Sequence, residues 1–491
     1  MRRVVALLAV TTLFVVGTGT VIGAIALAAG TQAIQISDDP YTNPDSQHKT
    51  QVEPDSFAFG RTIVATFQSG RFFDGGASNV GWSTSTDGGA TWTHGFLPGT
   101  TVNATPPGIY DRVSDPSVSF DPKRRVWMIA TLAIRNVGAN DVIINRSTDG
   151  GLTWTNPVAV ALGDGPSFYD KEWIGCDTTA SSPFFGNCYV QWDDAGRGNL
   201  MLMSTSANGG VTWGAPKQTA NHETGTIGGQ PVVLASGKVV VPFLGNFGME
   251  AFNSTDGGNT WSTPIVISSV SYHTPAGGIR APLPGPSVEV RTPGLIIVAW
   301  GDCRFEPSCN ANDIVFSTSG NGTSWTPVTR IPLDPIGSGV DHFLPGIAVQ
   351  PQATTNTTLA HFALGYYFYP VSNCNSSTCR LNVGFSFSIG GANWSPPQTL
   401  AGPMQLAWLA NTNQGRMVGD YMSTSYSGVN AFPVYDAAVM PNPPPAFNEA
   451  TFTTQEPAFS FTGPTLKASS AGAKYGAGHQ WRPVPGVTTA N

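Results

Sequence analysis

One octapeptide recurs along this chain and constrains its fold more than any other feature. Four copies share a serine at the start, a Gly-Gly pair in the middle and a tryptophan at the end. They are STDGGATW (Ser85 to Trp92), STDGGLTW (Ser147 to Trp154), SANGGVTW (Ser206 to Trp213) and STDGGNTW (Ser254 to Trp261). Two altered copies end at Trp325 and Trp394. A repeat of about 60 residues indicates an array of similar units, each built around the same turn.

The octapeptide has the composition of a tight hairpin turn. Asp87, Asp149 and Asp256 can accept hydrogen bonds from backbone N–H groups of their own turn, and glycine tolerates the positive φ that such turns need. The tryptophan then begins the next strand and can pack its indole on the sheet. We therefore assign a structural role to these aspartates and to the tryptophans Trp92, Trp154, Trp213 and Trp261.

A second, weaker repeat predicts the inner strand of each unit. Its seven segments are VEPDSFAF at Val52, SDPSVSFD at Ser114, DKEWIGCD at Asp170, GQPVVLAS at Gly229, GPSVEVRT at Gly285, LPGIAVQP at Leu344 and GDYMSTSY at Gly419. Charged residues make up only 11% of the chain, with 57 Gly and 39 Pro, which favours short strands and tight turns. We predict an all-β fold, a β-propeller of about seven blades over residues 51–461, with six blades as the alternative. The seventh segment has no octapeptide, so it forms its own blade or completes the first.

The two ends of the chain differ from the repeats. Residues 1–30 carry Arg2 and Arg3 before a long apolar run and an Ala-Leu-Ala triplet, the pattern of an export signal. The run is also long enough for an uncleaved membrane anchor. Residues 31–50 form a polar lead-in, and residues 462–491, rich in Gly, Ala, Ser and Pro, are predicted to be a flexible tail.

The cysteines and the charge of the chain agree with an exported protein. The six cysteines fall into three close pairs, and export favours local disulfides, although six cysteines allow other pairings. The pairs are Cys176 with Cys188, Cys303 with Cys309, and Cys374 with Cys379. None has the spacing of a zinc site. The net charge is −7 and no stretch concentrates Lys or Arg, which excludes the basic surface of a nucleic-acid binder.

The octapeptides resemble the Asp box, S-x-D-x-G-x-T-W, also called the BNR repeat, of sialidases and related propellers. The resemblance implies that each copy joins the third and fourth strands of a blade at the periphery, away from the ligand. Ligands of propellers usually bind at the mouth of the central channel, near the starts of the inner strands. Polar residues at those starts are candidates for binding: Glu53, Asp55, Asp115, Asp170, Lys171, Glu172, Gln230, Asp341, His342, Asp420 and Tyr421.

A sialidase would also need three arginines for the substrate carboxylate, a tyrosine nucleophile, a glutamate that activates it and an acid/base aspartate. By resemblance, FQSGRFFD supplies Arg71 and the acid/base Asp74, VAWGDCRF supplies Arg304, and GDYMST supplies the nucleophile Tyr421. Arg280 and Arg416 are further candidates for holding substrate. The opening Arg-Ile-Pro of the family is replaced by Val52-Glu53-Pro54, and an acid there would repel a sialic acid.

Two functional hypotheses follow. The first is a secreted, sialidase-like glycoside hydrolase. The second is a non-catalytic propeller that binds glycans or a protein partner at the cell surface, with Trp408, Tyr366, Tyr367 and Tyr369 as stacking surfaces. We expect a glycan or glycoconjugate as partner, no nucleic acid, membrane contact only through an N-terminal anchor, and a monomer. No cofactor is predicted. Aspartates and backbone carbonyl oxygens in the turns could bind calcium, but no loop has a recognisable calcium spacing.

Overall fold

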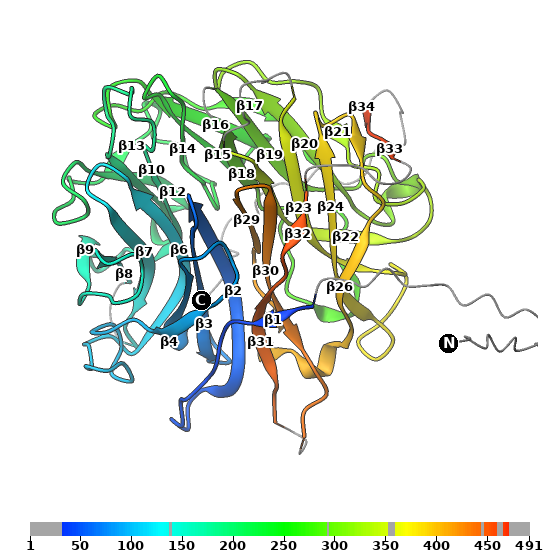
Figure 1. The fold of residues 1–491 in the computed structure, drawn as a ribbon, viewed down its shortest axis with the longest axis horizontal. Helices are drawn as coiled ribbons and strands as arrows, with labels where there is room; N and C mark the ends of the chain where they lie inside the picture. Colours follow the sequence, from blue (N-terminus) through cyan, green and yellow to red (C-terminus); the bar gives the residue numbers. More distant parts are fainter. Residues whose placement is uncertain are drawn as a thin grey trace, which may run out of the picture. The chain divides into compact units, whose positions relative to one another are not determined.

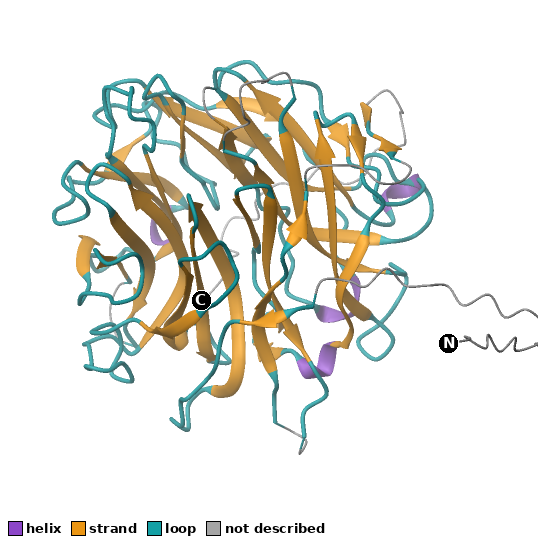
Figure 2. Cartoon of the chain, viewed as in Figure 1, coloured by secondary structure: helices purple, strands orange, loops and turns teal. Residues whose placement is uncertain are grey.

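The computed structural model describes residues 32–136, 140–291, 294–351, 359–442, 446–458 and 465–470. Strands dominate these ranges (Figure 2). The helices in them are four short 3₁₀ turns: η1 (Ala195–Arg197), η2 (Ala276–Gly278), η3 (Pro307–Cys309) and η4 (Leu406–Trp408). None of these has the length and apolar character that a bilayer-crossing helix requires. The predicted signal or anchor, residues 1–30, lies outside the described ranges.

The described strands group into seven blades that follow one another around the molecule in chain order (Figure 1). The innermost strand of each blade contacts the innermost strand of the next, and the last contacts the first, which closes the ring. These strands are β2 (Gln47–Phe59), β6 (Arg112–Asp121), β10 (Tyr169–Cys176), β14 (Val232–Val233), β18 (Ser287–Arg291), β22 (Asp341–Val349) and β29 (Ser423–Ser427). The fold is therefore the predicted propeller, and its seventh segment forms a blade of its own.

Each blade adds antiparallel strands outward from the channel. The second strands are β3 (Thr62–Arg71), β7 (Val126–Ile134), β11 (Cys188–Asp194), β15 (Val239–Gly245), β19 (Leu295–Asp302), β23 (His361–Tyr369) and β30 (Asn430–Ala438). The third are β4 (Ala77–Ser85), β8 (Asp141–Ser147), β12 (Leu200–Ser206), β16 (Gly248–Ser254), β20 (Asp313–Ser319), β24 (Arg380–Ile389) and β31 (Glu449–Thr453). The outer strands are β5 (Thr93–Phe96), β9 (Val158–Ala161), β13 (Lys217–Gln218), β17 (Ile265–Ser268), β21 (Thr329–Arg330), β25 (Asn393–Trp394) and β26 (Gln398–Gln405). A hairpin of β27 (Ala410–Thr412) and β28 (Gly415–Met417) precedes the seventh blade, and β32 (Glu456–Pro457) pairs with β30.

Single residue pairs connect the seventh, first and second blades at their edges. β2 meets β31 only at Thr50 and Glu449, and β4 meets β6 only at Ala77 and Val113. All other pairing in these strands stays within one blade. The blades are therefore separate sheets that touch, as a propeller requires.

Both ends of the described chain add strands that the sequence did not predict. β1 (Ile34–Gln35), inside the polar lead-in, pairs with β31 and becomes the outer strand of the seventh blade (Figure 1, blue beside orange). Residues 465–470, assigned to a flexible tail, form β33 (Leu466–Lys467) on β25 and β34 (Ser469–Ser470) on β21. The C-terminal segment thus extends the outer edges of two neighbouring blades, the fifth and the sixth (Figure 1).

The Asp boxes form the compact turns between the third and fourth strands. In the first box, Asp87 Oδ1 accepts a hydrogen bond from the Thr91 N–H (2.9 Å) and Oδ2 accepts one from the Thr91 hydroxyl (2.6 Å). Hydrogen bonds to Thr91 lower the pKa of Asp87 to about 2. Asp149 and Asp256 make the same bonds with Thr153 and Thr260. This geometry corresponds to the structural role that the composition of the octapeptide indicates.

The second glycine of each box also explains why the motif tolerates no side chain there. Gly151 has a φ of +85°, and a Cβ on it would lie 2.8 Å from Val64 of the preceding blade. The carbonyl of Gly151 accepts a hydrogen bond from Thr84 of that blade (2.7 Å). The box therefore staples its own hairpin and also fixes the contact between neighbouring blades.

The core lies between neighbouring blades. Three tryptophans on the second strands, Trp127, Trp192 and Trp300, are among the largest fully buried side chains. The terminal tryptophans of the octapeptides are less uniform, because Trp261 and Trp394 are buried while Trp92, Trp154, Trp213 and Trp325 are half-buried. The indole that can pack on the sheet is thus buried in two of the six copies and half-buried in the other four.

The three predicted disulfides are confirmed. Cys176 pairs with Cys188, Cys303 with Cys309 and Cys374 with Cys379, and no cysteine is left free. Each bond closes a short loop, with sequence separations of 12, 6 and 5 residues. Disulfides of this kind persist in oxidising compartments outside the cytoplasm.

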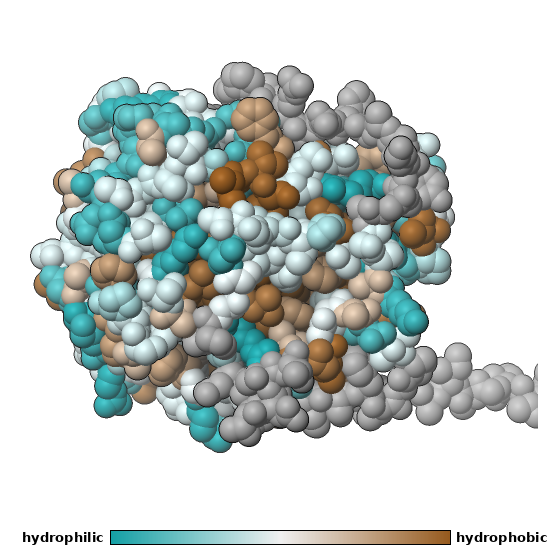
Figure 3. All heavy atoms as spheres, turned by 90° about the horizontal axis from the view of Figure 1, so that it is seen from above, coloured by the Kyte–Doolittle hydropathy of each residue, from teal (hydrophilic) through white to brown (hydrophobic). Residues whose placement is uncertain are grey.

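The surface carries exposed hydrophobic side chains in small groups. Figure 3 shows one face on which hydrophilic and near-neutral residues predominate and the hydrophobic residues gather in separate patches. The large exposed hydrophobics include Phe73, Ile109 and Phe247, which lie on three different loops. Scattered residues of this kind are ordinary for a folded domain and indicate no docking site.

We predict that Trp261→Ala lowers the free energy of unfolding by about 3–5 kcal/mol, because a large buried indole is lost. Trp261 is 4% exposed, and its ring packs against Phe252 of its own blade and Tyr189 of the preceding one. Urea denaturation measures the loss. The matched variant Trp154→Ala removes a half-buried indole and should cost clearly less; an equal loss would contradict the assignment.

Candidate functional site

Four innermost strands carry a β-bulge at equivalent positions. The pairing register shifts between Val52 and Asp55 in β2, and likewise in β6, β10 and β22. The residue inside each bulge has a left-handed backbone: Glu53 (φ 58°), Asp115 (φ 48°), Lys171 (φ 51°) and Leu344 (φ 50°). A non-glycine residue rarely adopts such a conformation, and bulges of this kind re-aim side chains next to functional sites.

Three of these bulge residues meet at one point. The Lys171 Nζ lies 2.7 Å from Asp115 Oδ1 and 3.6 Å from Glu53 Oε1. It also lies 2.5 Å from Oδ2 of Asp420, which precedes β29. Arg280 donates to the same Asp420 oxygen at 2.7 Å. Lys171 and its acids thus join the first, second, third and seventh blades in a buried charge cluster.

Arg71 belongs to this charge cluster through an intermediate side chain. Its Nη1 donates to Gln68 Oε1 (2.7 Å), and the Gln68 amide contacts Glu53 and the Ser114 hydroxyl. Arg71 is 1% exposed, and burial together with Arg280 lowers its pKa to about 10. Arg71, Arg280 and Lys171 therefore face the three acids Glu53, Asp115 and Asp420.

Burial and neighbouring charges shift the pKa values of Glu53 and Asp420 in opposite directions. Burial raises the pKa of Glu53 to about 7, and the neighbouring Asp115 adds to this effect. Burial also opposes ionisation of Asp420, but Arg280 and Lys171 outweigh it and hold the pKa of that carboxyl well below its usual range. Asp420 is therefore the acid that stays ionised most firmly.

A pocket opens beside the charge cluster. It encloses about 600 Å³, part of it open to solvent, and its polar lining comes from Lys171, Glu172, Gln230, Asp420 and Tyr421. The rest of the lining is largely apolar: Trp173, Ile227, Gly228, Ala281, Pro282, Leu283, Gly285, Pro286 and Leu344. Apolar walls with a few convergent polar groups are typical of small-molecule sites.

Glu172 has no hydrogen-bond partner for either carboxyl oxygen, although it is 1% exposed. Burial and the neighbouring Asp115 raise its pKa well above the ordinary value. Asp420 Oδ1 also has no partner. The pocket therefore contains one carboxyl group whose pKa is raised and one whose pKa is lowered.

An aromatic pair lies between this pocket and the central channel. Trp173 and Tyr421 meet edge to face with ring centroids 5.0 Å apart, and Trp173 also lines the channel cavity of about 1140 Å³. All seven innermost strands contribute to that cavity. The Tyr421 hydroxyl donates to the Pro116 carbonyl (3.0 Å), and burial, with Glu53 next in effect, raises its pKa far above 10.

The structure brings most of the inner-strand candidates together. Glu53, Asp115 and Asp420 join Arg71 and Arg280 in the charge cluster, and Tyr421 lines the pocket beside it. Asp170 lies at the foot of the third bulge, where it accepts a hydrogen bond from the Lys171 N–H (3.0 Å).

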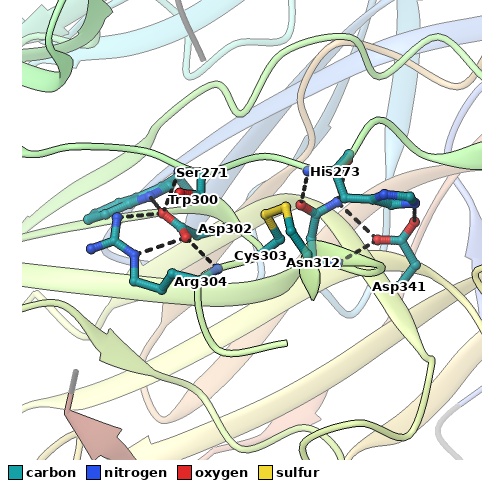
Figure 4. The surroundings of a disulfide bond; sticks show 9 residues. Ser271, His273, Trp300, Asp302, Cys303, Arg304, Asn312 and Asp341 are labelled. Carbon is teal, nitrogen blue, oxygen red and sulfur yellow. Dashed lines mark hydrogen bonds and ion pairs between the residues drawn. A yellow bond between two sulfur atoms is a disulfide. The ribbon is translucent and has the colours of Figure 1, made fainter. Parts of the chain in front are cut away.

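Two residues implied by the sialidase resemblance, Asp74 and Arg304, lie away from the pocket. The Asp74 side chain is 61% exposed and pairs with Arg112. Arg304 folds back onto Asp302 beside the Cys303–Cys309 disulfide (Figure 4). Its guanidinium also donates to the Ser268 hydroxyl and the Ser269 carbonyl. Neither residue contributes to the lining of the pocket.

Arg416 differs from Arg280, although the two segments run side by side. The Arg280 N–H donates to the Arg416 carbonyl (2.6 Å), yet the Arg416 side chain donates to the Leu409 carbonyl (3.0 Å). Only Arg280 of this pair reaches Asp420. Of the three arginines that a carboxylate grip requires, none contributes to the lining of the pocket.

The aromatic stacking surface expected at Tyr366, Tyr367 and Tyr369 is not there. All three rings are at most 2% exposed, because they pack into the cores on either side of β23. Trp408 is half-buried against one of these cores. That part of the binding hypothesis is wrong, and the aromatic surface at the pocket consists of Trp173 and Tyr421.

One group of metal-type ligands occurs outside the pocket among the described residues. Asp313, Asp334 and His342 have ligand atoms within 4.8 Å of one another. Arg330 already donates to Asp313 and Asp334, at 2.7 Å each. His342, whose pKa burial lowers to about 4, contacts the Asn312 carbonyl. The guanidinium supplies positive charge to these carboxylates, so they form an ion-pair network.

The fold is therefore an Asp-box propeller with a pocket beside its buried charge cluster. The chain belongs to the family of BNR repeat-like domains, whose model matches residues 128–402, more than half of its length. No curated protein matches the chain.

Solved structures with a similar fold include several glycosidases. A Hadza microbial sialidase is 14% identical, covers 84% of this chain and 66% of its own, and has a TM-score of 0.43. The α-L-arabinofuranosidase of Fusarium graminearum is 15% identical over 72% of this chain and 97% of its own, with a TM-score of 0.42. The sialidase of Trypanosoma rangeli is 12% identical over 87% and 60%, with a TM-score of 0.44.

Proposed function

We propose that the protein is an exported glycoside hydrolase of sialidase-like fold that acts on glycans in the pocket beside Lys171. The observation that carries this proposal is the pair formed by Glu172 and Asp420. Both line the same pocket, and their surroundings drive their pKa values apart. Two carboxyl groups tuned in this way are the arrangement by which glycosidases divide acid and base work.

In this proposal Glu172 is the general acid. Its protonated carboxyl gives a proton to the glycosidic oxygen as the bond to the leaving group breaks. Asp420 is the carboxylate that stabilises the positive charge developing at the anomeric carbon. A water molecule then bonds to that carbon and gives a proton to the Glu172 carboxylate, which restores the acid. Oδ2 of Asp420 is held by Lys171 and Arg280, so the unpartnered Oδ1 is the oxygen available to the sugar.

The assignment taken from the sialidase resemblance, with Asp74 as acid/base and Tyr421 as nucleophile, is the competing proposal. A tyrosine nucleophile must lose its proton, and a raised pKa works against this. The exposed Asp74 is paired with Arg112. These observations favour the carboxyl pair. Export is proposed from the N-terminal sequence and is supported by the three disulfides.

A panel of fluorogenic glycosides tests the proposal and the competing assignment together. We expect hydrolysis of at least one uncharged glycoside, with Tyr421→Phe and Asp74→Asn both keeping activity within about 10-fold of the parent. Efficient release of sialic acid that both substitutions abolish would establish the sialidase assignment instead. Binding on a glycan array without any turnover would support a non-catalytic propeller and contradict the proposal.

A further inference from the structure

Lys171 is the only basic residue among those that line the pocket. An acidic sugar, such as a uronic acid or a sialic acid, needs a cation for its carboxylate, and Arg280 is 1% exposed and bonded to Asp420. Whether the pocket accepts an acidic sugar therefore depends on whether the Lys171 ammonium is available.

The Lys171 ammonium is surrounded by three acids. Its Nζ donates to Asp115 (2.7 Å) and Asp420 (2.5 Å) and lies at ion-pair distance, 3.6 Å, from Glu53 Oε1. The side chain is 8% exposed. A further carboxylate, from a ligand, would lie beside acids that already neutralise this ammonium and that repel a second anion.

The fully buried side-chain polar atoms of the lining residues that have no partner are all carboxyl oxygens. They are Oε1 and Oε2 of Glu172 and Oδ1 of Asp420. Sugar hydroxyls can donate to such oxygens, whereas a sugar carboxylate only accepts. Glu172 is the second, independent indication of a ligand here. Its carboxyl is 1% exposed and has no hydrogen-bond partner, and buried polar groups in proteins normally have one.

We infer that Glu53 and Asp115 select uncharged sugars by occupying the Lys171 ammonium, so that the pocket has no cation for an acidic sugar. This inference rests on the proposed function of the pocket. Glu53 and Asp115 do not line the pocket themselves. They act through Lys171 as positioning residues, held in place by the bulges of the first two blades.

Matched pairs of glycosides that differ only in a carboxylate test the inference. The probes are methyl glucoside with methyl glucuronide, and methyl galactoside with methyl galacturonide, with binding measured by calorimetry. We expect the native protein to bind the neutral member of a pair at least about 10-fold more tightly. In Asp115→Asn, Lys171 loses one ionised partner, so the ratio should move toward the uronide by about 10-fold.

A loss of structure would weaken the binding of both members of a pair alike. The ratio of the two affinities therefore distinguishes a change in selectivity from a folding defect. Glu53→Gln gives a second route to the same shift, and Asp45→Asn, at an exposed position, is the control that should leave the ratio unchanged. Equal or tighter binding of the uronide by the native protein, or an unchanged ratio in both variants, would overturn the inference alone. Binding of no member of either pair would overturn the proposed function as well.

Discussion

Replacement of Glu172 by glutamine should lower the turnover of glycosides with poor leaving groups by about 10²- to 10⁴-fold. A leaving alkoxide needs a proton as the bond breaks, and glutamine has none to give. Glu172 is suited to this task because burial raises the pKa of its carboxyl, while the oxygens themselves are not committed to any other group. Steady-state kinetics of Glu172→Gln on methylumbelliferyl and alkyl glycosides measures the loss.

A substrate with a better leaving group separates acid catalysis from general damage to the site. Dinitrophenolate leaves without a proton, so the variant should cleave a dinitrophenyl glycoside at a rate close to that of the parent. The free energy of unfolding of Glu172→Gln should not fall below that of the parent either. The pKa of Glu172 is raised on folding from about 4.5, so its contribution to stability is lost as the pH rises through the folded value. The glutamine variant should therefore be the more stable protein at alkaline pH. An equal loss on both substrates would contradict the acid role.

Asp420→Asn should lower the free energy of unfolding by about 3–5 kcal/mol, because it leaves buried cations without their carboxylate. Arg280 would lose the acid that it bonds at 2.7 Å, and Lys171 one of its three acids. Both cations are buried. Urea denaturation at neutral pH measures the loss. Hydrolysis should fall with it, because Asp420 is also the proposed carboxylate at the anomeric carbon.

The pH dependence of the Asp420 contribution has a definite sign. The pKa of Asp420 is lower in the folded protein than its ordinary 3.8. Its stabilisation is therefore present above about pH 4 and disappears as the pH falls through the folded value. Asp164→Asn is the matched control, since it removes an aspartate from an exposed pair with Arg197 (side chains 63% and 36% exposed) and should change stability little. A similar loss in both variants would show that the charge cluster contributes no more than a surface pair.

The sequence predicts the fold well because its signal is local and repeated. Each Asp box contains its own turn, with Asp87 bonded to Thr91 four residues later, so the motif forms the same structure wherever it occurs. The terminal strands carry no such signal. Gln35 and Ser469 belong to strands of two residues whose formation depends on an open edge in another part of the chain, and a single sequence does not reveal that edge.

The site is predicted in part for a related reason. Glu53, Asp115 and Lys171 are found because equivalent positions of successive blades converge on the same axis. Arg304 does not reach the pocket, because its guanidinium forms an ion pair with Asp302, two residues away. The raised pKa of Glu172 arises from its burial among residues that are distant in the sequence, including the segment from Ala281 to Pro286. Residue type alone does not distinguish this carboxyl from its neighbour Asp170.

A crystal structure of Glu172→Gln soaked with an uncharged glycoside tests the central claim most directly. The proposal predicts a sugar in the pocket beside Trp173 and Tyr421, with its glycosidic oxygen within about 3 Å of the residue 172 amide and its anomeric carbon facing Asp420. A sugar bound at another face of the propeller, or held in the pocket with its anomeric carbon remote from both residues, would contradict it.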